Sequence, residues 1–349
     1  MMRSPKSFAV VCRRADGSIV VKEDEWRPLW GDFKLLRAPF LRGAVVLLES
    51  LVNGISALTF SANQQMEDEK LAEEAAEADK KPKPKPKSVG AAAAGDDSNH
   101  LATIGMVLVS LVFGLALFVG APHLLAWAMG EVLGFDTSSF TFHAVDGVIK
   151  LAILVTYMWA ISLLPDVRRV FQYHGAEHKA IFTYERGLPL TVDNARKQTR
   201  FHPRCGTSFL LIVIMVSVVL FSAVFAAFFP SELTGTKILD HLIMIGIKIP
   251  LMFPIAGLSY ELIKVAGKHC DTSWWARWLS APGMWLQKIT TKEPDDQQLE
   301  IALISIRKVI WRELLGDEAG PIGEGGVDTY PSIEAIELPV HPQAQAQAA

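Results

Sequence analysis

The sequence is poor in cysteine, and its few cysteines lack the spacing of a disulfide framework or a redox motif. Cys12, Cys205 and Cys270 are far apart in the 349-residue chain, and their number is odd. Secreted disulfide scaffolds and CxxC redox sites require closely paired cysteines, so both classes are excluded and a reducing compartment is expected. The first residues also lack the apolar core and cleavage site of a signal peptide, so none is expected.

A strong charge of either sign is also missing. The chain has 34 Lys and Arg residues against 37 Asp and Glu residues, a formal net charge of −3, which predicts no nucleic-acid partner. Apolar residues are abundant instead, since half of the residues are hydrophobic and the mean hydropathy is +0.26. This composition indicates that the partner is the lipid bilayer.

Four stretches are long and apolar enough to cross a bilayer as helices. They are Leu101 to Met129, Val145 to Leu164, Thr207 to Phe229, and Ile238 to about Leu262. The loop between the second and third stretches is rich in Lys and Arg, whereas residues 130–143 contain neither. By the positive-inside rule, the basic loop and both termini lie in the cytoplasm. The fold class is therefore predicted to be a mostly α, polytopic membrane protein of a bacterial inner membrane.

The residues before the first span divide into three segments. Residues 1–38 contain two β-type runs, Phe8 to Cys12 and Ile19 to Val21, around an Asp-Gly turn, which predicts a small cytoplasmic β-hairpin. Residues 39–65 are apolar on average but carry charges, as expected of an amphipathic or re-entrant helix. Residues 66–98 combine an acidic run with a Lys-Pro repeat, which predicts a disordered linker.

The remaining segments follow from the spans. Residues 99–164 and 207–264 hold two predicted transmembrane helices each, and residues 165–206 between them form a cytoplasmic loop subdomain. Residues 265–315 begin with a stretch in which Trp274, Trp275, Trp278 and Trp285 lie beside basic residues, a mixture typical of interfacial helices, and a cytoplasmic helix is expected to follow. The Gly-, Pro- and Gln-rich residues 316–349 are predicted to be a disordered tail.

The basic loop contains an HxxEH motif formed by His174, Glu177 and His178. On a helix, residues four apart share a face, so the two histidines can bind one metal ion. In this order of residues, a glutamate next to the second histidine can act as general base on a metal-bound water. The motif therefore predicts a metal site that needs at least one more ligand.

A second local motif, His202 with Cys205, lies in the same loop just before the third span. Imidazole nitrogen and thiolate sulfur are both good Zn²⁺ ligands. Four bound ligands would make a closed structural site, whereas three would leave a position open for hydrolytic chemistry. The alternative without metal is that the histidines meet lipid phosphates and Cys205 packs inertly.

Lys248 lies near the middle of the fourth predicted span, where an ionisable group marks a candidate functional site. Glu49, Asp146 and Glu261 are the carboxylates available to neutralise it, and Lys248 with Glu49 and Glu261 is our candidate intramembrane polar site. The alternative is a purely structural pair within the bundle. Asp146 and Lys150 have the i, i+4 spacing of a stabilising ion pair.

Six strings in the chain match a known family in the same order. They are Met2 to Pro5, YHGAEHK at Tyr173 to Lys179, LTVDNAR at Leu190 to Arg196, HPRCGTSF at His202 to Phe209, GLSYE at Gly257 to Glu261, and TTKEPDD at Thr290 to Asp296. By these strings the chain resembles the YqhQ-like family of bacterial multi-span membrane proteins, a domain of unknown function. Relatives usually carry a Gly-rich stretch before the first string, where this chain begins.

The resemblance implies a metal-dependent enzyme without an established substrate. It also implies that His174, Glu177, His178, His202 and Cys205 are the functional positions. Two interpretations follow. The leading one is a metal-dependent hydrolase with Zn²⁺ at the cytoplasmic face and Glu177 as base or fourth ligand. The alternative is a transporter, pore or membrane scaffold with a structural metal, which with four spans would require oligomerisation.

Overall fold

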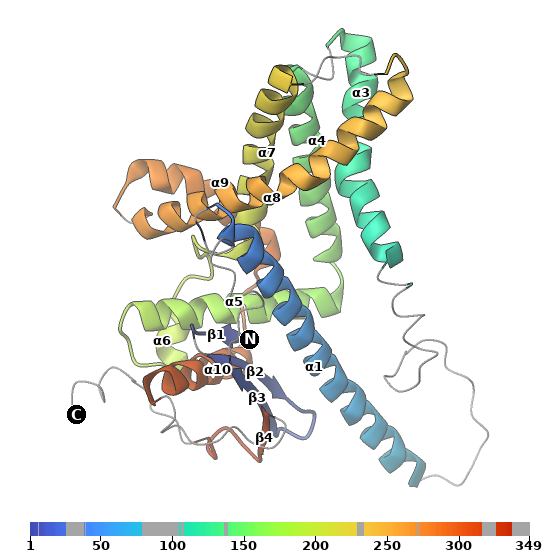
Figure 1. Ribbon diagram of the computed structural model, residues 1–349. Helices are drawn as coiled ribbons and strands as arrows, with labels where there is room; N and C mark the ends of the chain where they lie inside the picture. The colour runs from blue at the N-terminus through green and yellow to red at the C-terminus, as the bar shows by residue number, and fades with distance from the viewer. Residues whose placement is uncertain are drawn as a thin grey trace.

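The chain folds into a helix bundle joined to a small sheet domain (Figure 1). The computed structural model describes residues 1–5, 7–25, 38, 40–78, 105, 108–135, 139–228, 234–270, 272–315 and 326–336. In Figure 1 the bundle lies above the sheet domain, and helix α5 (Pro165–Glu185) lies between them. The predicted fold class, a mostly α protein with a small N-terminal β element, is confirmed.

The sheet domain is built on a four-stranded antiparallel sheet in the order β1-β2-β3-β4. The predicted hairpin is formed by β2 and β3, whose turn contains Gly17 with φ of 89°. The prediction of a disordered tail is wrong for part of residues 316–349, because β4 is an edge strand and Ile336 is buried. Four residues are too few to show a strand periodicity in the sequence. The strands are Met2–Arg3, Ser7–Arg13, Ile19–Glu25 and Val327–Tyr330.

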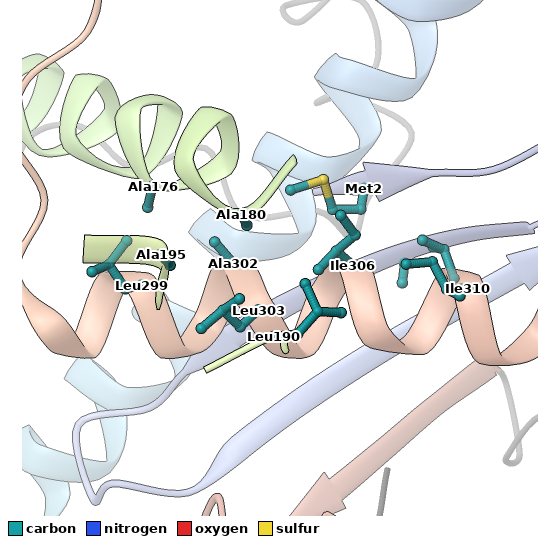
Figure 2. Packing of buried hydrophobic residues seen from close by; sticks show 12 residues of the cluster. Met2, Ala176, Ala180, Leu190, Ala195, Leu299, Ala302, Leu303, Ile306 and Ile310 are labelled. Atoms are coloured by element: carbon teal, nitrogen blue, oxygen red, sulfur yellow. The ribbon is translucent and has the colours of Figure 1, made fainter. Parts of the chain in front are cut away.

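Helix α10 (Asp296–Leu315) is the centre of the sheet domain, since it packs on the sheet and on α5 (Pro165–Glu185). On one face, Leu299, Leu303 and Ile306 meet small residues of α5 and the short helix α6 (Val192–Arg196), as Figure 2 shows. On its other side, α10 contacts the buried side chains of the sheet. The small residues of α5 allow a close approach, which fixes α5 and its HxxEH motif on the domain.

A buried ion cluster joins the sheet to α10. Glu23 of β3, which is 3% exposed, lies 2.6 Å from the Lys308 ammonium and 2.7 Å from Arg312 Nε. Buried charges are tolerated only when they are paired. The cluster therefore fixes the register between strand and helix.

Among the residues that the structure describes, five helical segments are long and apolar enough to cross a membrane. Four of them overlap the four predicted spans, and the fifth is α1, so the count from sequence is one lower. The segments are α1 (Arg42–Ala78), residues Leu108–Leu133 with η2 (Ala116–Gly120) and α3 (Ala121–Leu133), α4 (Phe140–Ile161), α7 (Gly206–Phe228) and α8 (Lys237–His269).

Helix α1 corrects the predicted linker. It continues through Met66 to Ala78, so the first part of residues 66–98 is helical, while residues 79–98 lie outside the described part of the chain. The Ala, Glu, Leu and Lys residues of this part are good helix formers, a preference that the charge-based prediction neglected. The helix is also held by Asp68, whose carboxylate accepts a 2.7 Å hydrogen bond from Arg14.

Two charged residues in the apolar part of α1 lie against other parts of the protein. Arg42 donates two hydrogen bonds of 2.6 Å to Glu261 of α8, and Glu49 is buried. Further along, Ala57 packs against Phe8 of the sheet. The helix thus extends from the bundle to the sheet domain (Figure 1). These contacts explain how charged residues occur in an apolar helix, which the sequence suggested to be amphipathic or re-entrant.

Helix α9 (Trp274–Thr290) connects the bundle to the sheet domain. Its small residues face α7, and Gly283 is so close to Ser208 that an added Cβ would touch that side chain. On the opposite side Trp274 and Trp278 are largely exposed, as expected of an interfacial helix. The chain after α9, residues 291–295, crosses α5 on its way to α10 and completes the surroundings of the HxxEH motif.

Candidate metal centre

Three predicted ligands meet at the junction of the bundle and the sheet domain. His174 and His178 lie one turn apart on α5, and Cys205 lies at the start of α7. Cys205 Sγ is 3.2 Å from His174 Nε2, and one ligand atom from each of the three residues lies within 4.8 Å of the others. Donors of a tetrahedral zinc site, with bonds of about 2.0–2.3 Å, are roughly 3.3–3.8 Å apart. The three residues therefore fit one metal ion.

Backbone carbonyls orient both histidine rings. His174 Nδ1 is 2.9 Å from the carbonyl oxygen of Thr290, at the end of α9, and His178 Nδ1 is 2.5 Å from that of Arg200. A carbonyl accepts only an N–H, so Nδ1 of each ring carries a proton, and loss of the Nε2 proton leaves the lone pair that can bind a metal. Metal-binding histidines are typically held in this way.

The surroundings of Cys205 favour its thiolate form. Burial raises the pKa of Cys205, but hydrogen bonds from His174 and His178 and the charges of both rings outweigh burial and lower it to about 5. The contact with Cys205 also changes the pKa of His174. Burial lowers this pKa, but the hydrogen bond to Cys205 and the charge of the thiolate outweigh burial and raise it to about 9. Thr207 Oγ1 also lies 3.2 Å from the sulfur. A thiolate is the form of cysteine that binds metal.

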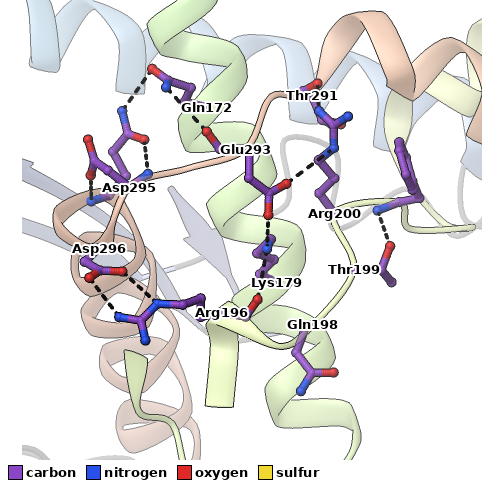
Figure 3. Close-up of polar contacts among 12 residues, drawn as sticks. Gln172, Lys179, Arg196, Gln198, Thr199, Arg200, Thr291, Glu293, Asp295 and Asp296 are labelled. Carbon is purple, nitrogen blue, oxygen red and sulfur yellow. Dashed lines mark hydrogen bonds and ion pairs between the residues drawn. The ribbon is translucent and has the colours of Figure 1, made fainter. Parts of the chain in front are cut away.

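Residues 290–296 run past α5 beside the site, and Figure 3 shows the ion pairs that Glu293 and Asp296 form with Lys179, Arg196 and Arg200. Glu293 pairs with Lys179 on α5 and lies 3.6 Å from Arg200, and the amide of Lys292 donates to the carbonyl of Phe171 at 2.8 Å. Gly175 is in contact with this segment, because a Cβ there would meet the Lys292 carbonyl oxygen. Only glycine allows this approach, which brings the Thr290 carbonyl to His174.

His202, the fourth predicted ligand, is not in the donor group. Its Nε2 lies 3.4 Å from a Glu185 carboxylate oxygen, and its Nδ1 accepts a 3.2 Å hydrogen bond from the Arg204 amide. Its backbone exchanges hydrogen bonds of 2.7 and 2.8 Å with the side chain of Gln287. Both ring nitrogens of His202 are thus engaged by other groups. Its ring lies beside that of His178, with ring centres 5.6 Å apart, so we interpret His202 as a residue that supports the site.

Glu177, the predicted base, is on α5 but outside the donor group. Its carboxylate lies 2.6 Å from the amino group of Met1 and is partly exposed. Its negative charge nevertheless acts on the His174 imidazole and helps to raise its pKa, although burial, which lowers the pKa, is the largest effect. The structure thus brings together three of the five predicted residues and places two beside them.

Lys248, the candidate intramembrane residue, pairs with a different carboxylate from the two predicted to form a site with it. Lys248 of α8 is 2% exposed and lies 3.3 Å from Asp146 of α4, the third carboxylate that the sequence offered. Glu261 pairs with Arg42 instead, and Glu49 is a buried residue of α1. The expected Asp146–Lys150 pair is present at 2.6 Å.

Sequence reasoning overlooked two histidines of the intramembrane cluster. His123 Nδ1 is 3.0 Å from Lys248 Nζ, and His123 Nε2 is 3.0 Å from His241 Nδ1. His241 and Lys248 are seven residues apart on α8, which places them on one helix face. This spacing of seven residues is the signal in the sequence that His241 and Lys248 belong to one cluster.

Comparisons with known proteins give a family but no activity. No solved structure matches the chain. An uncharacterised protein, YqhQ of Bacillus subtilis (strain 168), is 32% identical over 317 residues, which cover 89% of each chain. Residues 38–312 match the family described as "Protein of unknown function (DUF1385)". This match includes every described residue of the metal centre and most of the bundle, so the chain belongs to the DUF1385 family.

Proposed function

We propose that this protein binds one zinc ion through His174, His178 and Cys205 and is a membrane-bound, metal-dependent hydrolase. The observation that supports this proposal is the convergence of three donor atoms within 4.8 Å, with each imidazole oriented by a backbone carbonyl. Catalytic zinc sites typically have three protein ligands and one open position. Two imidazoles with one thiolate are a donor set that suits zinc.

A zinc ion with an open position supplies a Lewis acid and lowers the pKa of water to about 7. Besides binding the ion, the residues of the chain would have two tasks. The Thr290 and Arg200 carbonyls hold the rings of His174 and His178 in the binding orientation. Glu177 is the proposed general base, since it is the carboxylate of the HxxEH motif and its charge acts at the site.

We further propose that the site faces the cytoplasm of a bacterial cell. The basic residues of the chain between α4 and α7 support this orientation by the positive-inside rule, and the exposed tryptophans of α9 support a position at the lipid surface. A topology reporter inserted at Asp193 should be active only in the cytoplasmic form. Activity of an external reporter would contradict both the orientation and the site's compartment.

Metal content is the decisive test. Full-length protein, purified in detergent without chelator, should contain about one equivalent of zinc by elemental mass spectrometry. His174→Ala and His178→Ala should lose it. His269→Ala, at the end of α8, is a matched control that should keep it. Absence of zinc and of any other transition metal from the wild type would contradict the proposal.

A structural metal is the second candidate function, because the three donors join α5 to the start of α7. The protein would then be a transporter, pore or scaffold, and the intramembrane polar residues would carry its activity. Glu177→Gln discriminates between the two. A hydrolase should keep its zinc and lose turnover, whereas a structural zinc site should tolerate the change in every assay.

A further inference from the structure

A second polar cluster lies inside the helix bundle, remote in sequence from the metal centre. It contains His123 of α3, Asp146 and Lys150 of α4, and His241 and Lys248 of α8. Apart from Lys150, these residues are at most 8% exposed. Ionisable groups in membrane-spanning helices are costly and are usually functional. The cluster shares no residue with the proposed zinc site.

The five side chains form a continuous line of polar contacts. His241 Nδ1 is 3.0 Å from His123 Nε2. The other nitrogen of this ring, His123 Nδ1, is 3.0 Å from Lys248 Nζ. Lys248 Nζ is 3.3 Å from Asp146 Oδ2, which also accepts a 2.6 Å hydrogen bond from Lys150. Because an ammonium can only donate, His123 Nδ1 is the acceptor and its Nε2–H donates to His241.

The charges of the cluster do not cancel. Two ammonium groups share one carboxylate oxygen, and with neutral histidines the sum is one positive charge. The rings of Phe142, Phe221 and Phe225 lie 5.4–6.0 Å from Lys248 Nζ and offer only cation–π attraction. In the described residues, α7 contributes no titratable group facing Lys248. Such an excess charge in a medium of low dielectric constant favours loss of one proton.

Two neighbouring groups are incompletely bonded. Both ring nitrogens of His143 and the Oδ1 atom of Asp146 are buried, and among the described residues they have no hydrogen-bond partner. His143 is 1% exposed and stacks on Phe225 with ring centres 5.3 Å apart. A purely structural network is normally satisfied throughout, because each unpaired buried polar group costs about 1–3 kcal/mol.

The geometry points to a proton-exchange site formed by His123, Asp146, Lys150, His241 and Lys248, which releases and rebinds one proton through His241. A proton fits these observations better than an anion does, because a proton requires no volume. Beside Asp146 the helices are in close contact, since a Cβ on Gly147 would touch Val218 of α7. A small anion would need space at this point.

Proton release follows the direction of the hydrogen bonds. Lys248 Nζ gives a proton to His123 Nδ1, and the His123 Nε2 proton moves to His241 Nδ1. His241 then loses its Nε2 proton to water, so the balance is one proton released and Lys248 left as a neutral amine. His241 lies near the first turn of α8. Figure 1 shows that this helix begins at the end of the bundle away from the sheet domain.

Histidine NMR tests this site without any assumption about the zinc or the reaction. Full-length protein with ¹⁵N-labelled imidazole rings is reconstituted in lipid nanodiscs and titrated from roughly pH 5 to 9, the range in which histidine reports protonation. Signals of His123 and His241 are assigned by their loss in the Gln variants. We expect the two signals to shift together with one common midpoint.

Lys248→Met is the informative variant, and His269→Gln is the control outside the cluster. Lys248→Met should remove the common midpoint, because the proton donor is gone, whereas His269→Gln should leave it unchanged. Constant His123 signals over the whole range in the wild-type protein would overturn the proposal. So would a common midpoint that persists in Lys248→Met. The wild-type titration decides the question even if the variant does not fold.

Discussion

The sharpest prediction concerns which histidines bind the metal. The sequence offers three equivalent candidates near Cys205, but in the structure His202 has both ring nitrogens engaged, with Glu185 and with the Arg204 amide. We therefore expect His178→Ala to abolish zinc binding and His202→Ala only to weaken it. The two variants remove the same side chain from positions whose ring centres are 5.6 Å apart, so each is a control for the other.

The magnitudes separate the two roles clearly. Structural zinc sites in peptides bind with about 10–16 kcal/mol, so one ligand of three contributes roughly 3–5 kcal/mol, or about 10²–10⁴ in affinity. Loss of a supporting residue typically costs about 10–100-fold. The His202 ring lies beside that of His178 and is 3.4 Å from a Glu185 carboxylate oxygen, so removal of this side chain should fall in the lower range.

A competition titration with a chromophoric zinc chelator measures both affinities on detergent-purified protein. Thermal unfolding of each metal-free variant shows whether the fold is retained. If His202→Ala lost zinc as completely as His178→Ala while remaining folded, the assignment of His202 as a supporting residue would be refuted. A four-ligand closed site would then be the correct description.

Three further predictions follow from the packing and charges. Gly175→Ala should lower zinc affinity and the midpoint of thermal unfolding, because the new methyl group meets the Lys292 carbonyl; a close-packing penalty is about 1–3 kcal/mol. Glu23→Gln should destabilise the sheet domain by about 3–5 kcal/mol in denaturant unfolding, since two buried cations lose their carboxylate. Burial raises the pKa of Glu185, but contacts with His202 and a neighbouring arginine lower it overall, so stability should fall as the pH drops below the ordinary value of 4.5. Glu185→Gln should flatten that dependence, and an unchanged slope would contradict the contact.

Local patterns in the sequence were sufficient to predict the elements that depend on neighbouring residues. The HxxEH motif is helical, and His174 and His178 share a face as their spacing requires. The apolar runs became the bundle helices, and the Asp-Gly turn became a hairpin. In each case the determining interactions lie within a few positions along the chain.

Contacts between distant segments decided the remainder. His202 and Cys205 are equivalent by spacing, and the choice between them depends on Gln287, 85 positions away. Three carboxylates were available to Lys248, and only the packing of α4 on α8 selects Asp146. The edge strand β4 and the helical extension of α1 are likewise stabilised by the hairpin, not by their own periodicity.

The position of the donors also determines when the site can exist. His174 and His178 belong to a helix of the sheet domain, Cys205 begins a membrane helix, and the Thr290 carbonyl comes from the end of α9. None of these segments holds the full donor set alone. The proposed zinc ion would therefore bind late, after membrane insertion and packing of the helices, and the metal-loaded fraction would count the correctly assembled molecules.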